Sequence, residues 1–392
     1  MVEVQDRLEK HESGATALAD ELAMIRDQAG RFFANGFAPR LDAWRQSGAV
    51  DAASWAEAGS SGLLCASIPE VYGGGGGGLA HEIVIQQEVS RAGLGSSFGI
   101  ANMVHSGIVA HYILAYGSEA QKQRWLPAMA RAERIGAIAM TEPGTGSDLQ
   151  AIHTSAKRVA GGFLVSGQKT FISNGQTANL IAVVVRTGAE AGKGLSILMV
   201  ETEDAAGFER GRKLEKIGLD AQDTSELSFQ DMFVPQDNLL GKEGDGFRQL
   251  KHQLVWERMM IAIDAVVNIE RAVELTIAYT RERSVFGNAL IDFQNTQFVL
   301  ADAKAQVLVA CSFIDAMIAR LLSGDLDAAT AAAAKLWATE TQCKVIDACL
   351  QLFGGYGYMT EYPIGRLYAD ARASRIYGGT SEIMKLIVAR AL

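Results

Sequence analysis

Two C-terminal segments decide the fold of this 392-residue chain: QLFGGYGY at Gln351–Tyr358 and IYGGTSE at Ile376–Glu382. Each sets a glycine pair among bulky side chains, in a region whose apolar residues otherwise recur at helical spacing. Glycine destabilises a helix interior, but without a Cβ it lets backbone N–H groups approach a bound anion or ring closely. The two segments therefore predict helix interruptions that serve a ligand.

Outside these segments, the spacing of apolar residues along the chain changes twice between a helical and a strand-like pattern. Long helical stretches are expected near Arg248–Arg281, Thr296–Leu322, Leu326–Leu352 and Pro363–Arg372. Between about Glu133 and Leu240, β-branched runs such as Leu180–Arg186 alternate with turn residues, which predicts a compact antiparallel β-domain. Helical spacing returns from Thr16 to about Arg131. We therefore predict three domains, at residues 1–132, 133–242 and 243–392.

Composition excludes several classes of partner. The formal net charge of −9 argues against nucleic acid or an anionic membrane. Four scattered cysteines without CxxC spacing are typical of buried thiols in a reducing compartment, and six histidines show no metal-ligand spacing. The polar start MVEVQDRLEKHES has no signal or transit pattern, so the cytoplasm is expected.

Two further stretches admit more than one interpretation. Residues 92–118 carry no Lys, Arg, Asp or Glu and are long enough to span a bilayer, but their histidines, Asn102 and glycines favour a buried helix. The run Gly73–Gly78 contains GxGxxG without a strand before it or a helix pattern around it. A flexible loop is the expected meaning of that run.

Glu257 is the candidate catalytic carboxylate. Spacings of four, three and four place Leu250, Leu254, Glu257 and Ile261 on one helix face, so a carboxylate occupies a slot in an apolar stripe. Loss of hydration there raises the pKa of a carboxyl and makes it a stronger base near neutral pH. The alternative from helix geometry alone is an ion pair of Glu257 with Arg258 or another cation at a packed interface.

Three more segments narrow the class of protein: AMTEPGTGSD at Ala139–Asp148, GQKTFISNG at Gly167–Gly175 and RSVFG at Arg283–Gly287. Together with the two tail segments, and in this order, they resemble the acyl-CoA dehydrogenase family of flavoproteins over nearly the whole chain. The resemblance implies an N-terminal helical domain, a β-barrel-like middle domain, a C-terminal four-helix bundle and FAD as cofactor.

The resemblance also implies where the base lies. Most family members carry it as the glutamate of a YEGT motif, and the matching positions here read Tyr377-Gly378-Gly379-Thr380. A minority, similar to the long-chain and isovaleryl-CoA dehydrogenases, carry it on the first bundle helix immediately before an arginine. Glu257-Arg258 has that position. Glu257 would then remove the α-proton of an acyl-CoA thioester, a hydride would pass to flavin N5, and the Gly378 N–H would polarise the carbonyl.

Cofactor and substrate contacts are transferred from the family residue by residue. The flavin ring contacts are implied at Met140, Thr141, Gly146, Ser147, Phe171, Ile172 and Ser173. The pyrophosphate and adenine contacts are implied at Gln351, Gly354 and Gly355 and, from a neighbouring subunit, at Arg283, Phe286 and Gln294, with Thr380 and Glu382 closing the site. Substrate contacts are implied at Ser147, Arg258, Gly378 and Gly379. Phe171 replaces a tryptophan of several relatives, Ser173 a threonine, and Glu382 a glutamine.

The implied partners are an acyl-CoA, an electron-transferring flavoprotein and further copies of the chain in a homotetramer, a dimer of dimers. Branched or medium to long acyl groups of fatty acid β-oxidation are expected as substrates, because relatives with the relocated base handle them. Two alternatives stay open: an oxidase or monooxygenase on the same fold, and a non-catalytic partner subunit of a mixed oligomer, which the missing tail glutamate suggests.

Overall fold

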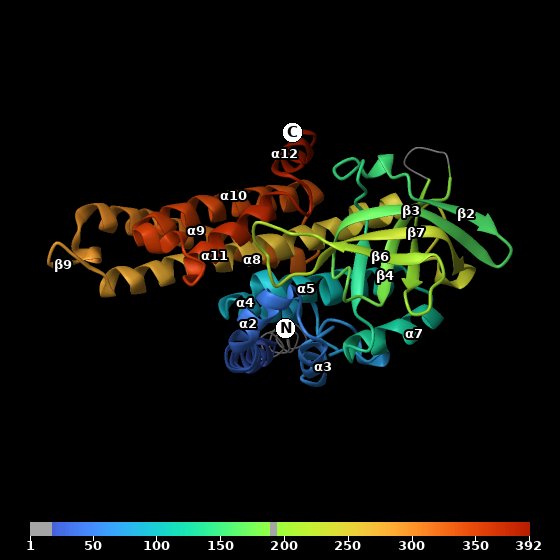
Figure 1. Cartoon of the computed structure of the whole chain (residues 1–392), viewed down its shortest axis with the longest axis horizontal. Helices are drawn as coiled ribbons and strands as arrows, with labels where there is room; N and C mark the ends of the chain where they lie inside the picture. The colour runs from blue at the N-terminus through green and yellow to red at the C-terminus, as the bar shows by residue number, and fades with distance from the viewer. Residues whose placement is uncertain (1–17, 189–193) are drawn as a thin grey trace, which may run out of the picture.

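A computed structural model describes residues 18–188 and 194–392. Three parts follow one another along the chain (Figure 1): N-terminal helices, a curled sheet at one end of the molecule, and long C-terminal helices that extend to the other end. The predicted order of helical, β and helical parts is confirmed. The boundaries at 132/133 and 242/243 stay predictions.

The N-terminal part is built around aromatic side chains. Its helices include α2 (Leu41–Ser47), α3 (Ala52–Ser60), α4 (Leu79–Arg91) and α7 (Glu119–Ala130). Phe37, Trp44, Trp55 and Phe98 are buried and pack ring against ring, with Phe37 and Phe98 centroids 5.0 Å apart. Aromatic pairs of this kind bury large apolar areas, which holds short helices together.

One helical run, Gly95–Tyr116, crosses the centre of the molecule and contains two π-helical segments. Its parts are η4 (Gly95–Gly99), α5 (Ile100–Asn102), η5 (Met103–Val109) and α6 (Ala110–Tyr116). Among the residues described, this run and α9 (Gln294–Leu322) are the two helices long and apolar enough to cross a membrane by length and composition. The central run is 83% buried over its most apolar window, as expected for a core helix, and α9 is 22% buried.

The glycine run Gly73–Gly78 forms a loop, as expected, but backbone hydrogen bonds fix it where a flexible loop was expected. The N–H groups of Gly75, Gly76 and Gly77 donate to the carbonyls of Cys65, Ile68 and Ala66 at 2.9–3.2 Å. A Cβ at Gly74 would collide with the carbonyl oxygen of Ile68. The glycines therefore let two backbone segments pack against each other.

The middle part is one curled sheet. Its strands are β1 (Gly136–Ala139), β2 (Ser155–Val159), β3 (Gly162–Ser173), β4 (Leu180–Arg186), β5 (Leu195–Glu201), β6 (Phe208–Lys213) and β7 (Thr224–Pro235). They lie in the order β1-β4-β2-β3-β7-β6, with β5 on β4. The sheet is mixed rather than purely antiparallel as expected, because β1 pairs in parallel with β4. Alternate residues of β4 face two different apolar clusters, which explains its unbroken apolar sequence.

The C-terminal part consists of α8 (Gly246–Glu282), α9, α10 (Ala328–Phe353) and the shorter α11 (Pro363–Ala371) and α12 (Ser381–Ala389). The bounds of α8, α9, α10 and α11 agree with the four helical stretches expected from the sequence, which did not include α12. The predicted interruptions are also confirmed: α10 ends where Gly354 has φ +58°, and Gly378 and Gly379 have φ +66° and +101°. Only glycine adopts such angles without strain.

Candidate active site

Glu257 lies on α8 with its carboxylate inside the protein, 6% exposed. Tyr112 Oη, from α6, donates a hydrogen bond to Glu257 Oε1 at 3.1 Å. Burial raises the pKa of the Glu257 carboxyl to about 7, and the Tyr112 hydrogen bond and the charge of Arg258 oppose that rise. A carboxylate with this pKa is a competent base near neutral pH.

The tail segment that contains Gly378 packs against the same turn of α8. Arg258 Nε donates to Gly378 O at 3.3 Å, and a Cβ at Gly378 would collide with Ile261 Cδ1. Arg258, the residue after Glu257, and Ile261, one turn further along α8, therefore both contact the Gly378 position. A side chain at position 378 would have to displace Ile261 and adopt a left-handed backbone, so the base cannot simply return to the tail.

Lys335 also holds this segment, and the sequence did not single it out. Its Nζ donates to Gly379 O at 2.7 Å, although the side chain comes from α10 and is fully buried. Burial, together with Arg258, lowers the pKa of Lys335 to about 8. A lone lysine inside the alanine-rich stretch Ala331–Ala338 was the available signal.

The two segments expected to contact the flavin ring lie side by side. Thr170 N donates to Thr141 O at 2.9 Å, and the buried Lys169 Nζ donates to Met140 O at 3.0 Å and to Glu142 Oε1 at 2.9 Å. Met140, Thr141 and Ser173 are half-buried, Gly146 and Ser147 are exposed, and Ile172 is buried in the sheet core. Ile172 can therefore offer a ligand only its backbone.

A further bond joins this ring-contact region to the central helix. Asn174, next to Ser173, donates from Nδ2 to Ala101 O at 2.9 Å and to Gly136 O at 3.0 Å. Ala101 lies on the run Gly95–Tyr116 that carries Tyr112. The strand expected beside the flavin is thus fixed to the helix that contacts Glu257.

Phe171 and Phe286 share two unusual properties. Their rings are 66% and 96% exposed, and their backbones have φ +59° and +50°. A left-handed backbone is strained for a bulky residue, and such strain concentrates at functional sites. Each phenylalanine presents a bare aromatic face, as contact with a planar ligand requires.

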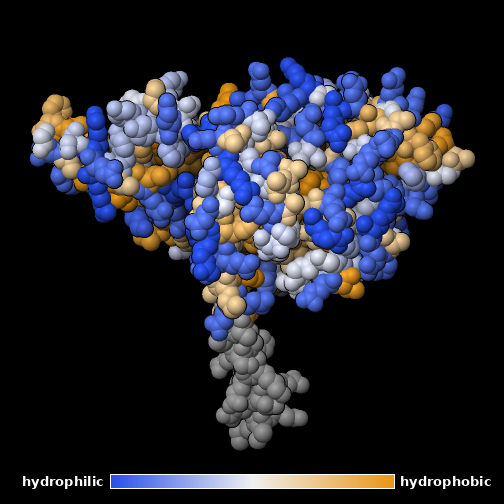
Figure 2. Space-filling view, turned by 60° about the horizontal axis from the view of Figure 1, so that its bottom comes forward, coloured by the Kyte–Doolittle hydropathy of each residue, from blue (hydrophilic) through white to orange (hydrophobic). Residues whose placement is uncertain are grey.

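The predicted pyrophosphate contacts gather at the far end of the bundle. A groove of about 550 Å³ there is lined by Arg283, Gln351, Gly354 and Gly355, and Tyr279 and Tyr356 also line it. A Cβ at Gly354 or Gly355 would meet no atom within 4 Å, so both backbones face open space. Phe286 and Gln294 lie next to this groove in the sequence and are exposed. Figure 2 shows apolar side chains on the surface at this end of the molecule.

The structure does not bring the two halves of the expected FAD site together in one chain. Arg283 follows the last residue of α8, and Glu257 lies 26 positions earlier, about 39 Å along the helix axis. Thr380 caps α12 by accepting from Ile383 N at 3.3 Å, and Glu382 is exposed on the first turn of that helix. Both lie beside Gly378 in the chain rather than at the bundle end.

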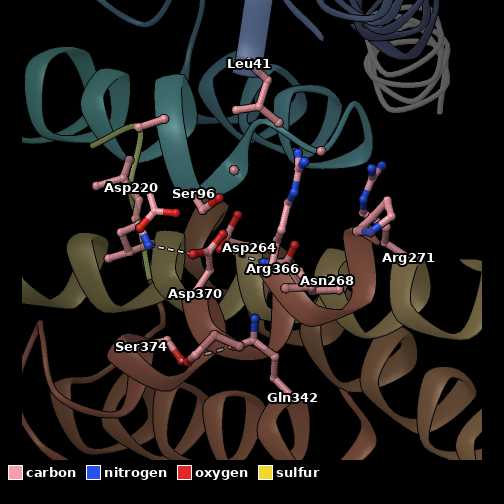
Figure 3. A pocket seen from close by; sticks show the side chains of 18 of the residues that line it. Leu41, Ser96, Asp220, Asp264, Asn268, Arg271, Gln342, Arg366, Asp370 and Ser374 are labelled. Atoms are coloured by element: carbon pink, nitrogen blue, oxygen red, sulfur yellow. Dashed lines mark hydrogen bonds between the residues drawn. The ribbon is translucent and has the colours of Figure 1, made fainter. Parts of the chain in front are cut away.

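A separate pocket of about 110 Å³ lies where α8, α11 and the N-terminal helices meet (Figure 3). Asp264 and Asp370 point into it from α8 and α11. Asp264 accepts hydrogen bonds from Ser90 and Asn268, and Asp370 accepts one from Leu219 N. Both carboxylates already accept hydrogen bonds from the protein. We therefore interpret this pocket as a set of polar contacts that holds the N-terminal and C-terminal parts of the fold together.

Family comparisons agree with this geometry. Models of the acyl-CoA dehydrogenase N-terminal, middle and C-terminal domains match residues 19–133, 137–232 and 244–392. The chain is 41% identical over 375 residues to the long-chain specific acyl-CoA dehydrogenase of Sus scrofa, covering 95% of this chain and 86% of the relative. It is 34% identical over 339 residues to the isovaleryl-CoA dehydrogenase of Oryza sativa subsp. japonica, covering 86% and 82%.

Solved structures give the same result. An acyl-CoA dehydrogenase from Geobacillus kaustophilus has a TM-score of 0.92 and 43% identity, covering 95% of this chain and 97% of that chain. A Bacillus anthracis acyl-CoA dehydrogenase complexed with FAD has a TM-score of 0.88 and 31% identity, covering 95% and 68%. The fold and the site thus define a flavin-dependent oxidoreductase. The chain belongs to the acyl-CoA dehydrogenase family.

Proposed function

We propose that this protein catalyses FAD-dependent α,β-dehydrogenation of an acyl-CoA to a trans-2-enoyl-CoA, with Glu257 as the base. One observation carries the proposal: a buried carboxylate lies on the same turn of α8 that contacts the tail glycine Gly378. The family supports acyl-CoA dehydrogenation in general, and the burial of Glu257 supports this residue as the base.

The residues present fit FAD. Thr141, Ser147 and Ser173 offer hydroxyl groups on two segments joined by a backbone hydrogen bond from Thr170 to Thr141, and Phe171 offers an exposed ring on the second of them. Arg283 offers a guanidinium in an open groove at the bundle end. Arginine suits bidentate contact with phosphate. When bound, FAD supplies the two-electron oxidant that accepts the β-hydrogen.

Groups of the chain itself supply the base and the hydrogen-bond donor that the reaction needs. Glu257, ionised above a pH of about 7, accepts the α-proton from its buried position on α8. The α-proton of a thioester is weakly acidic, so the carbonyl needs a hydrogen-bond donor where negative charge develops. The Gly378 N–H is our candidate for that donor, since Arg258 and Lys335 fix the carbonyls of Gly378 and Gly379.

The oligomer we propose is a homotetramer, in which a partner copy completes the FAD site. The separation of about 39 Å along α8 between Glu257 and Arg283 supports this assignment, because it places the candidate base and the guanidinium far apart within one chain. Exposed apolar side chains on α9, namely Phe298, Leu308, Val309 and Leu322, supply a surface suited to another copy.

Two other functions were left open by the sequence. A non-catalytic partner subunit is disfavoured by Glu257, because a buried carboxyl with a pKa near 7 is costly to keep for structure alone. An oxidase or monooxygenase on this fold would differ in how easily oxygen reaches the reduced flavin.

The proposal also includes the substrate class, the electron acceptor and the location. We propose branched or medium to long acyl groups, an electron-transferring flavoprotein as acceptor and a cytoplasmic location.

Anaerobic titration of the purified yellow protein with acyl-CoAs of varied length and branching tests these assignments together. We expect bleaching of the flavin absorbance, strongest with branched or longer chains, and slow recovery in air. An unbleached or colourless protein would contradict catalysis. Rapid peroxide formation on admitting air would favour the oxidase, and a preference for butyryl-CoA would overturn the substrate assignment.

A further inference from the structure

Tyr112 lies buried on α6, near the end of the central helix, and its hydroxyl is hydrogen-bonded to Glu257. Its side chain is 0% exposed, and its hydroxyl donates to Glu257 Oε1 at 3.1 Å. The two residues are 145 positions apart in the chain, so the contact exists only because α6 crosses α8. A buried hydroxyl that donates to a carboxylate forms a charge-assisted bond, stronger than one between neutral groups.

The two oxygens of Glu257 differ as a result. Oε1 accepts from Tyr112, whereas no hydrogen bond reaches Oε2 from the residues at 18–188 and 194–392. A hydroxyl on one oxygen fixes the plane of the carboxylate and leaves the other oxygen to accept a proton. This is the arrangement expected for an oriented general base.

Other ionisable groups lie near Glu257 on α6, α8, α10 and the tail segment. None of those named below donates a hydrogen bond to its carboxylate. His111 stacks on Trp256 at 5.6 Å, and burial lowers its pKa to about 4, so it is neutral. Arg258 points to Gly378 O and Lys335 to Gly379 O. Tyr116 bonds to His252 Nδ1 at 3.0 Å. Near the tail segment, Tyr377 is a neutral phenol because burial raises its pKa, and Arg375 pairs with Glu340, which also accepts a hydrogen bond from Ser381.

We propose that Tyr112 is a positioning residue that holds the Glu257 carboxylate in its reactive orientation and favours its ionised form. This inference rests on the proposed role of Glu257 as base. It adds a specific donor from the N-terminal part to a reaction whose other groups come from the C-terminal part and the sheet. A hydrogen bond to the charged form of an acid favours that form.

The test compares the pH dependence of kcat/KM in the FAD-loaded wild type and in Tyr112→Phe, with Tyr116→Phe as matched control. Tyr116 lies one turn away on α6, and its ring packs on Tyr112 at 6.1 Å. Loss of the Tyr112 hydroxyl should move the acid limb of the kcat/KM profile to higher pH by about one unit. This shift corresponds to the free energy of one charge-assisted hydrogen bond. Below the limb, kcat/KM should fall about tenfold, while Tyr116→Phe should follow the wild type.

A second variant tests the opposite direction while keeping the ring and its hydroxyl. Replacement of Tyr112 by 3,5-difluorotyrosine makes the hydroxyl a stronger donor and should move the acid limb to lower pH, so the idea stays testable if Tyr112→Phe loses flavin. An acid limb unchanged in both variants would overturn the inference. Glu257→Gln separates the two proposals: if it retains normal turnover, Glu257 is not the base and the proposed mechanism fails first.

Discussion

The two ends of α8 present opposite kinds of site. At Glu257 the helix is covered by α6, the tail segment and α10 of the same chain. At Arg283 the helix ends in an open groove, with Phe286 almost fully exposed. The first region is preorganised before any ligand binds, whereas the second needs another surface to exclude water. In our proposal, a single helix thus carries the catalytic base in its enclosed part and, at its open end, an arginine that binds the cofactor of a neighbouring copy.

The largest effect should come from the enclosed end. Glu257→Gln keeps the volume and removes the base, so kcat should fall by several orders of magnitude, at or beyond the roughly 10²–10⁴-fold typical of general-base loss. Flavin content should stay normal, as judged by absorbance. Glu274→Gln, on an exposed position of the same helix, is the control and should behave as wild type. Near-normal turnover of Glu257→Gln would show that the proton goes elsewhere.

At the open end, Arg283→Ala should weaken FAD binding by roughly 10- to 100-fold, from loss of a charge-assisted contact. Isothermal titration of FAD into apoprotein measures this change. In the proposed oligomer the affected site belongs to the neighbouring copy, so co-expression of Arg283→Ala with Glu257→Gln should create mixed oligomers with some intact sites. Activity well above that of either variant alone is expected. Activity no higher than the sum of the two would place both residues in the same site.

A smaller effect is expected at the support of the tail segment. Lys335→Met keeps the length of the side chain but leaves the Gly379 carbonyl without its donor, so the adjacent Gly378 N–H should lose orientation. We expect kcat to fall about tenfold with little change in KM, since a positioning contact acts mainly on the transition state. Lys344→Met, exposed on the same helix, is the matched control. A change confined to KM would contradict a role in orientation.

The smallest effect should follow Phe286→Ala. Its ring makes almost no contact within the chain, so thermal unfolding of the apoprotein should stay within about 2 °C of wild type. FAD affinity should nevertheless fall a few-fold, by about the worth of one stacking contact. Unchanged affinity would show that the exposed ring serves another purpose.

Sequence patterns predicted the elements well because each depends on local spacing. The helical stretches, the strand Leu180–Arg186 and the two glycine interruptions all agree with the structure. The sheet was expected to be antiparallel because alternation along a strand carries no information about its neighbours. Its parallel pair depends on where β1 enters from the helical part.

In the candidate site, too, the sequence predicted what depends on local spacing and missed what depends on how the chain folds. Glu257 was a candidate from the sequence because a carboxylate interrupts an apolar helix face, which left an ion pair as the alternative, and the family resemblance then indicated the role of base. Tyr112 and Lys335 were not, because a tyrosine in a buried helix and a lysine in a long helix are ordinary until the chain folds. Their contacts with Glu257 and Gly379 span 145 and 44 positions. Such partners are set by how helices cross, which no local pattern encodes.

The π-helical segment Met103–Val109 sets the phase of everything that follows it on the central helix. A π turn carries about one residue more than an α turn, so if this stretch became regular α-helix at the same length, α6 would rotate by about 100°. The Tyr112 hydroxyl would then turn away from Glu257. Exchanges that abolish the π turns should therefore disturb the candidate base even at residues that do not contact it.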